Sequence, residues 1–177
     1  MTGTPTETLR LRPGTAHDLA AVNTVIEQAV HTWKLPERVL RLSLPSYRYS
    51  EHDLEFLELI VAVDTTDMIV GVAGIEPADS ADCPAGSRGL LLHGLYVRAD
   101  RQREGIGRRL LDAVATTARE RGYDGVLVKA QADSAGFFAA QEWEHLPVEN
   151  GARDYPYRYW RHTQSASVSH TLFNVEP

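Results

Sequence analysis

The sequence predicts an α/β fold in which about four helices flank one central sheet of six to seven strands. The chain has 177 residues, 43% hydrophobic and 24% charged, which suits one globular domain with a substantial core. Short runs rich in Val, Ile and Leu are interspersed with segments whose apolar residues recur at helical spacing. The order is strand, two helices, three strands, helix, strand, helix and two strands, which is typical of helices packed on one mixed sheet.

The first elements are a strand and a helix. Residues 9–12 alternate leucine and arginine before Pro13-Gly14, which predicts a short, half-exposed strand. Thr15 and Asp18 have the spacing of a capping box, which marks a helix start. Apolar residues then recur at helical spacing, so we expect this helix to continue to about Val30.

A second helix and a hairpin come next. We expect the short helix to begin at Pro36 and to end at Pro45, since proline disrupts a helix interior, and a loop to follow. Residues 57–63 and 68–75 are apolar and joined by a polar turn, which predicts two buried strands of a hairpin. A loop rich in Gly, Pro, Ala and Asp occupies residues 77–87.

The C-terminal half begins with a third central strand at residues 89–97. An amphipathic helix begins near Gly105 and ends at Gly122, with arginines in its last turn. The remaining elements are expected to be a strand at 125–130, a helix at 134–141 and strands at 143–148 and 155–161. We therefore predict a single domain over residues 1–162 and a polar tail over 163–177.

Charge and cysteine content exclude several classes of function. The net charge of -6 argues against nucleic acid or an anionic membrane as partner, since both need a broad basic face. Such a chain would suit a cationic substrate such as an amine, although solubility explains the charge equally well. Cys83 is the only cysteine, which excludes an intramolecular disulfide and a cysteine-rich metal site. No signal peptide or membrane-spanning stretch is recognisable, so we predict a cytoplasmic protein. We also expect no bound metal.

The most informative stretch contains a strand end, a tight loop and a helix that starts on Gly-x-Gly, over residues 95–111. Helix N-termini present unpaired N–H groups and partial positive charge, which suits a phosphate. The glycines let the backbone approach a ligand closely. Five of the 18 basic residues lie in this stretch: Arg98, Arg101, Arg103, Arg108 and Arg109. An anionic ligand is therefore predicted here.

Among known phosphate-binding loops, one pattern fits. A Walker loop is absent, and the dinucleotide fingerprint would need a glycine where Leu110 stands. Gln102-Arg103-Glu104-Gly105-Ile106-Gly107 fits Gln/Arg-x-x-Gly-x-Gly/Ala and, between Leu-Tyr-Val and Arg-Arg-Leu-Leu, resembles motif A of the GNAT acetyltransferase superfamily. The alternative is a glycine-containing turn before an ordinary helix.

The resemblance implies a GNAT fold with a mostly antiparallel sheet and acetyl-CoA as co-substrate. It implies that the strand before the loop splays from its neighbour, and that a backbone N–H of residues 95–97 polarises the acetyl carbonyl. The activity it implies is acetyl transfer to a primary amine of a small molecule or peptide, by direct attack in a ternary complex. The implied cofactor-binding residues are Leu95, Tyr96, Val97, Gln102, Arg103, Glu104, Gly105, Ile106, Gly107 and Arg108.

Residues 131–143 are similar to motif B of the same superfamily, with departures. Phe138 replaces the tyrosine that often protonates the departing CoA thiolate, Gln131 replaces an asparagine, and Glu142-Trp143 replaces Gly-Phe. The general acid therefore stays open. The candidates are water and three tyrosines near the last strand: Tyr155, Tyr157 and Tyr159.

His93 is the candidate catalytic base. Imidazole titrates near neutral pH, and alternation along the strand places His93 on the same face as Leu95 and Val97. Its position also resembles one of the paired histidines of arylalkylamine N-acetyltransferases, the other position being Leu91 here. The alternative is a structural histidine.

The acceptor side and the class of function leave alternatives open. Trp33, Tyr47, Tyr49 and Glu51 either form an aromatic, weakly acidic amine site or cover the core. A CoA-binding domain without turnover and a nicotinamide enzyme are the competing interpretations. A homodimer is possible, with the tail as one means of contact.

Overall fold

The computed structural model describes residues 8–131, 134–141 and 143–163. Its strands are β1 (Arg10–Pro13), β2 (Glu58–Val63), β3 (Ile69–Pro77), β4 (Gly89–Val97), β5 (Gly125–Lys129), β6 (Glu144–His145) and β7 (Arg158–His162). Its α-helices are α1 (Leu19–His31), α2 (Glu37–Tyr47), α3 (Ile106–Glu120) and α4 (Ala135–Ala139). Most of the predicted tail, residues 164–177, lies outside the described residues.

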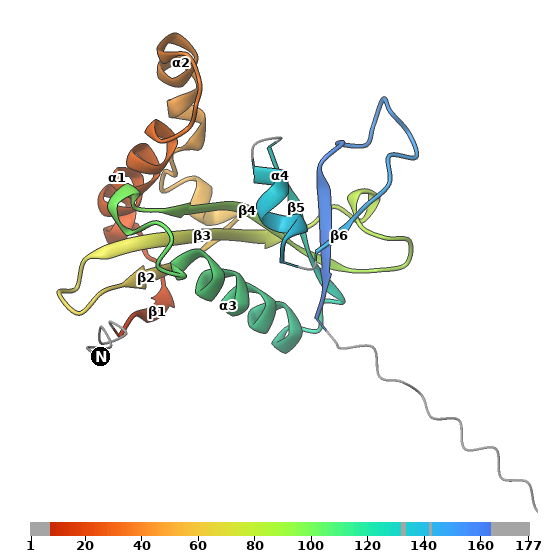
Figure 1. Ribbon diagram of the computed structural model, residues 1–177. Helices are drawn as coiled ribbons and strands as arrows, with labels where there is room; N and C mark the ends of the chain where they lie inside the picture. The colour runs from red at the N-terminus through yellow and green to blue at the C-terminus, as the bar shows by residue number, and fades with distance from the viewer. Residues whose placement is uncertain (1–7, 132–133, 142, 164–177) are drawn as a thin grey trace, which may run out of the picture.

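All seven strands belong to one sheet, in the order β1-β2-β3-β4-β5-β7-β6. Every neighbouring pair is antiparallel except β4 and β5, which run parallel. The predicted α/β fold with a mixed, mostly antiparallel sheet and four helices is therefore confirmed (Figure 1).

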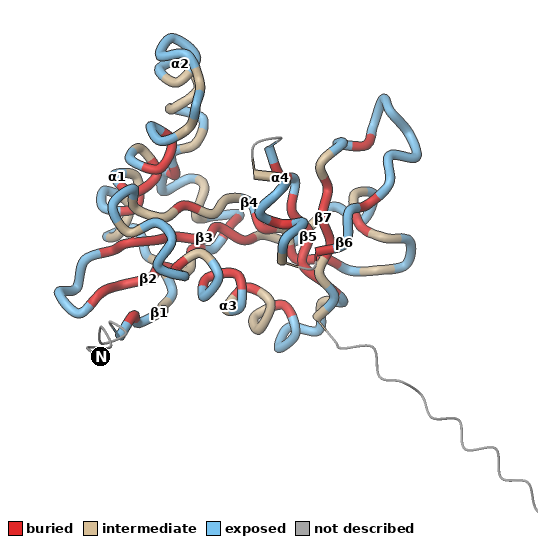
Figure 2. The backbone as a smooth tube through the Cα atoms, viewed as in Figure 1, coloured by how far each residue is buried: buried red, intermediate tan, exposed pale blue. Residues whose placement is uncertain are grey.

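The sheet buries a separate apolar cluster on each face. On one face α3 contributes Ile106, Leu110 and Val114, which pack with Leu90 and Leu92 of β4. On the other face α1 packs its apolar side against the sheet, in a cluster that contains Val22, Ile26, Val61, Val72 and Tyr96. Figure 2 shows the central strands largely buried, while α2, which has no buried residue, projects outward. In the described chain, no helix is long and apolar enough to cross a bilayer.

The prediction that Pro45 ends the second helix is wrong. The helix α2 continues to Tyr47, with Pro45 inside its last turn. A proline there removes one N–H donor close to where the helix ends anyway, and Arg48 is already extended. The late strands are shorter than predicted, since β6 is a two-residue edge strand and β7 begins at Arg158.

We expect Gly125→Ala to lower the free energy of unfolding by about 1–3 kcal/mol. A Cβ at Gly125 would collide with the indole of Trp160, which is fully buried, and with the carbonyl oxygen of Arg161. Urea denaturation measures the change. Gly151→Ala, where a Cβ meets nothing, is the matched control, and equal stability of the two variants would contradict the packing argument.

Candidate active site

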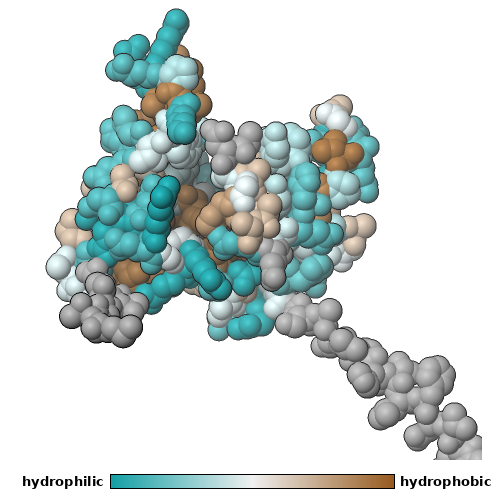
Figure 3. Space-filling view, viewed as in Figure 1, coloured by the Kyte–Doolittle hydropathy of each residue, from teal (hydrophilic) through white to brown (hydrophobic). Residues whose placement is uncertain are grey.

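The sheet opens between its two parallel strands. The ladder between β4 and β5 runs from Gly89–Gly125 to Leu92–Val128 and stops, whereas β4 stays paired with β3 as far as Val97. A cavity of about 720 Å³ occupies the resulting gap, bounded by the ends of α1 and α2, the N-terminus of α3, and α4. Figure 3 shows apolar side chains within the hollow between these parts.

The predicted site residues converge on this cavity. His93 and every predicted cofactor-binding residue except Glu104 line it. Glu104 instead forms an ion pair with Arg101, whose Nε lies 2.8 Å from Glu104 Oε2. The loop is also hydrogen-bonded to the end of β4, since Gln102 Nε2 donates to the Val97 carbonyl oxygen at 3.3 Å.

The loop before α3 has the backbone needed for an anion. Gly105 precedes the helix with φ of 81°, and Arg103 also has a positive φ, 66°. The Arg109 N–H donates to Gly105 O at 3.1 Å, as in a regular helix. The N–H groups of Ile106, Gly107 and Arg108 precede this bond at the helix terminus, where intrahelical partners are lacking. Such donors and the helix dipole suit the oxygens of an anion.

The predicted patch of five arginines is smaller than the sequence indicates. Arg98 is bidentate with Asp100, Arg101 pairs with Asp64 and Glu104, and Arg109 donates to the Leu9 carbonyl oxygen at 2.8 Å. Arg103 and Arg108 are exposed and line the cavity, and the described part of the chain offers them no ion pair. These two arginines are the ones placed to meet an anionic ligand.

The prediction that His93 shares a face with Leu95 and Val97 is wrong. Gly74 pairs with Gly94 and the next residue, Ile75, pairs with Leu92, so His93 is the extra residue of a β-bulge. Leu92 and Leu95 both pack on the α3 side of the sheet, and the bulge sends His93 to the opposite, α1 side. His93 is nevertheless exposed at the cavity, because the bulge lies where β5 leaves β4.

Tyr49 is the partner of His93, a role the sequence did not predict. Its hydroxyl lies 3.1 Å from His93 Nδ1, and its backbone exchanges hydrogen bonds with the Asn23 side-chain amide. Burial raises the pKa of Tyr49 well above its usual range, so the group stays a phenol at neutral pH. A Cβ on Gly74 or Gly94 would collide with the Tyr49 hydroxyl. The sequence held one indication of this contact, the two glycines inside predicted strands, since glycine in a strand often marks the close approach of another group.

The three tyrosines considered as general acid do not line the cavity in the described chain. Tyr159 is buried and stacks on Phe138, with ring centroids 6.0 Å apart. Tyr155 is exposed and packs edge-on against Tyr157. Phe138 itself is buried against Trp143. The aromatic residues of this region therefore serve mainly in packing.

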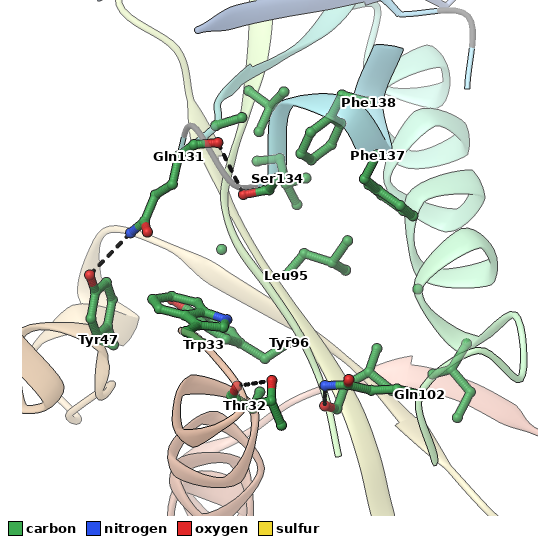
Figure 4. A pocket seen from close by; sticks show the side chains of 18 of the residues that line it. Thr32, Trp33, Tyr47, Leu95, Tyr96, Gln102, Gln131, Ser134, Phe137 and Phe138 are labelled. Carbon is green, nitrogen blue, oxygen red and sulfur yellow. Dashed lines mark hydrogen bonds between the residues drawn. The ribbon is translucent and has the colours of Figure 1, made fainter. Parts of the chain in front are cut away.

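The acceptor-side residues divide into two groups. Trp33 and Tyr47 line the cavity from the ends of α1 and α2, whereas Tyr49 lies behind His93 and exposed Glu51 does not reach the lining. Figure 4 shows Trp33 and Tyr47 on the side of Leu95 opposite Phe137 and Phe138. The cavity therefore has one side at the N-terminus of α3 with Arg103 and Arg108, an aromatic side at the ends of α1 and α2, and His93 in its lining. No group of three or more potential metal-ligating side chains occurs within the described ranges.

The chain thus combines a mixed sheet whose two parallel strands part with a helix that starts after a glycine beside the gap. A family model described as "Acetyltransferase (GNAT) family" matches residues 24–143, and the chain belongs to this family. A comparison with curated proteins found no match.

Solved structures show the same fold. A GNAT family acetyltransferase from Brucella melitensis, in complex with acetyl-CoA, is 17% identical, with 90% of each chain covered and a TM-score of 0.61. An acetyltransferase of the GNAT family from Staphylococcus aureus Mu50 is 18% identical, with 89% of this chain and 100% of that chain covered and a TM-score of 0.60. At these identities the likeness concerns the fold.

Proposed function

We propose that this protein transfers the acetyl group of acetyl-CoA to a primary amine of a small molecule or peptide, by direct attack in a ternary complex. The observation that carries the proposal is one cavity that joins the N-terminus of α3 to the unpaired edge of β4 and to His93. Membership of the GNAT family supports it, as does the acetyl-CoA held by the Brucella relative.

The residues present fit acetyl-CoA. The N–H groups at the start of α3, with Arg103 and Arg108, would hold the pyrophosphate. Beyond Leu92 the edge of β4 faces the cavity instead of β5, so its backbone groups are available to the pantetheine amides. A backbone N–H of residues 95–97 would polarise the acetyl carbonyl and stabilise the oxyanion as it develops.

Transfer then requires two proton movements. The amine nitrogen attacks the thioester carbon, the carbon–sulfur bond breaks, and the nitrogen loses a proton to His93. For Nε2 of His93 to accept that proton, Nδ1 carries a hydrogen and donates it to the Tyr49 hydroxyl. The CoA thiolate takes a proton from water or from the imidazolium, because Phe138 has none to give.

Calorimetric titration with acetyl-CoA, with NADH as the control, tests the cofactor. We expect micromolar binding of acetyl-CoA alone, whereas binding of NADH alone would favour a nicotinamide enzyme. Release of free CoA thiol with a panel of primary amines tests turnover. Binding without turnover across the panel would favour the alternative, an acyl-CoA-binding sensor or interaction module. Phe138, in the place of the usual tyrosine, supports that alternative. Cytoplasmic localisation, a homodimer and the domain boundary at residue 162 stay predictions.

Tyr49→Phe is expected to lower kcat about tenfold, which corresponds to the loss of one hydrogen bond to the imidazole. The ring remains to fill its buried site, so stability and acetyl-CoA affinity should change little. Because Tyr49 acts through His93, the acidic side of the pH–rate profile should also move. Tyr155→Phe, at the exposed surface, is the control, and an unmoved profile in Tyr49→Phe would refute the positioning role.

A further inference from the structure

The aromatic side of the cavity has a defined lining. Trp33 and Tyr47 meet edge to face, with ring centroids 5.1 Å apart and an interplanar angle of 81°. Thr32, Ser46 and Tyr96 complete this side with hydroxyl groups and a third ring. Figure 4 shows Trp33 next to Tyr96, with Tyr47 on the other side of Trp33. Two half-buried rings and a buried one offer flat apolar area close to His93.

The described residues that line this side of the cavity carry no negative charge. Within the described part of the chain, no aspartate or glutamate lines the cavity at all. Asp53 is close enough for His93 to influence its pKa, but its carboxylate accepts hydrogen bonds from the Ser50 backbone N–H and hydroxyl, each at 2.7 Å. Other carboxylates of the chain lie away from the cavity, as in the ion pairs of Asp18 with Arg12 and of Glu58 with Arg121.

A hydrogen bond crosses the cavity at its aromatic side. Gln131 Nε2, at the end of β5, donates to the Tyr47 hydroxyl at the end of α2 over 3.1 Å. Figure 4 shows this bond linking the two walls of the cavity. A hydrogen bond across the cavity at this point favours a small acceptor over a polypeptide.

We propose that the acceptor is a small molecule with one amino group on an aromatic body and no second cationic group. This inference rests on the proposed function and names its substrate class. The ring would pack against Trp33 and Tyr47 while the amine points to His93. A second ammonium group would be taken out of water with no carboxylate partner among the described lining residues, which is unfavourable.

Matched amines test the substrate class. The probes are 2-phenylethylamine, 1,5-diaminopentane and spermidine, added to the 177-residue protein. Calorimetry in the presence of CoA measures their binding, and thiol release from acetyl-CoA measures kcat/KM. We expect 2-phenylethylamine to exceed both polyamines at least about tenfold in each measurement. Equal or better binding of a polyamine, or no binding of 2-phenylethylamine, would overturn the inference.

Variants of Trp33 and Tyr47 test whether the amine preference arises on the aromatic side of the cavity. Trp33→Ala should weaken 2-phenylethylamine binding at least about tenfold, whereas Trp33→Phe, which keeps a ring, should stay close to wild type. Tyr47→Glu should shift the preference toward 1,5-diaminopentane by adding the missing carboxylate. Acetyl-CoA affinity should stay unchanged in all three, and Tyr155→Ala is the control for loss of an aromatic outside the cavity. An unchanged preference in both Trp33→Ala and Tyr47→Glu would contradict the assignment.

The two proposals fail in different ways. If 2-phenylethylamine binds as expected but no thiol is released, the acetyltransferase proposal is wrong, whereas the proposed preference of the site for an aromatic amine is retained. If spermidine is acetylated faster than 2-phenylethylamine, the enzyme stands and the aromatic acceptor falls.

Discussion

Gly107→Arg is expected to weaken acetyl-CoA binding at least about 100-fold, a loss of about 2.8 kcal/mol. Gly107 lies in the first turn of α3 and lines the cavity. A Cβ there meets only Val97 and Leu95, at 3.7 and 3.9 Å, so the fold accepts a side chain. The long arginine would extend into the space proposed for the pyrophosphate. Calorimetry of the purified variant measures the loss.

Gly151→Arg is the matched control. It adds the same side chain at an exposed position where a Cβ meets nothing, far along the chain from the loop. Thermal denaturation of both variants checks that they are folded. Retained acetyl-CoA affinity in folded Gly107→Arg would remove the cofactor assignment, and with it the function that depends on it.

His93→Ala is expected to lower kcat by about 100- to 10,000-fold, the range for removal of a general base. A general base acts only when unprotonated, so the wild-type rate should rise from the acidic side of the pH–rate profile. The variant should lack this rise. Acetyl-CoA affinity should be retained, because the phosphate-binding end of the cavity is unchanged.

The pH–rate profile separates a base from a structural histidine. His145→Ala removes an exposed histidine that bonds the Pro156 carbonyl oxygen outside the cavity, and it should keep the wild-type profile. A His93→Ala enzyme with an unchanged profile would make His93 a structural residue. The amine would then have to lose its proton to water.

The loop before α3 and the helix itself were predictable because their signals are local. Gly105 takes a positive φ at the helix start, and the apolar positions of α3 follow one another at helical spacing. Both features depend on a few consecutive residues. For the same reason the order of helices and strands was read correctly, and the sheet topology agreed with the resemblance.

The geometry around His93 was not predictable, because it depends on residues far apart in the chain. The bulge arises from the register of β3 against β4, and Tyr49 reaches His93 over 44 positions of sequence. Strand alternation alone therefore put His93 on the wrong face. The arginine patch was overestimated because ion pairs such as Arg101 with Asp64 form only in the folded chain.

The two apolar clusters of the sheet divide the cavity into parts that can change separately. Trp33 and Tyr47 pack on the α1 cluster, whereas Leu95, Ile106 and Phe138 belong with the α3 cluster. Substitutions at the ends of α1 and α2 are therefore expected to disturb one core and to spare the loop before α3. Exchanging residues 32–47, which leaves Tyr49 beside His93, is therefore expected to change the proposed acceptor preference while acetyl-CoA affinity stays the same.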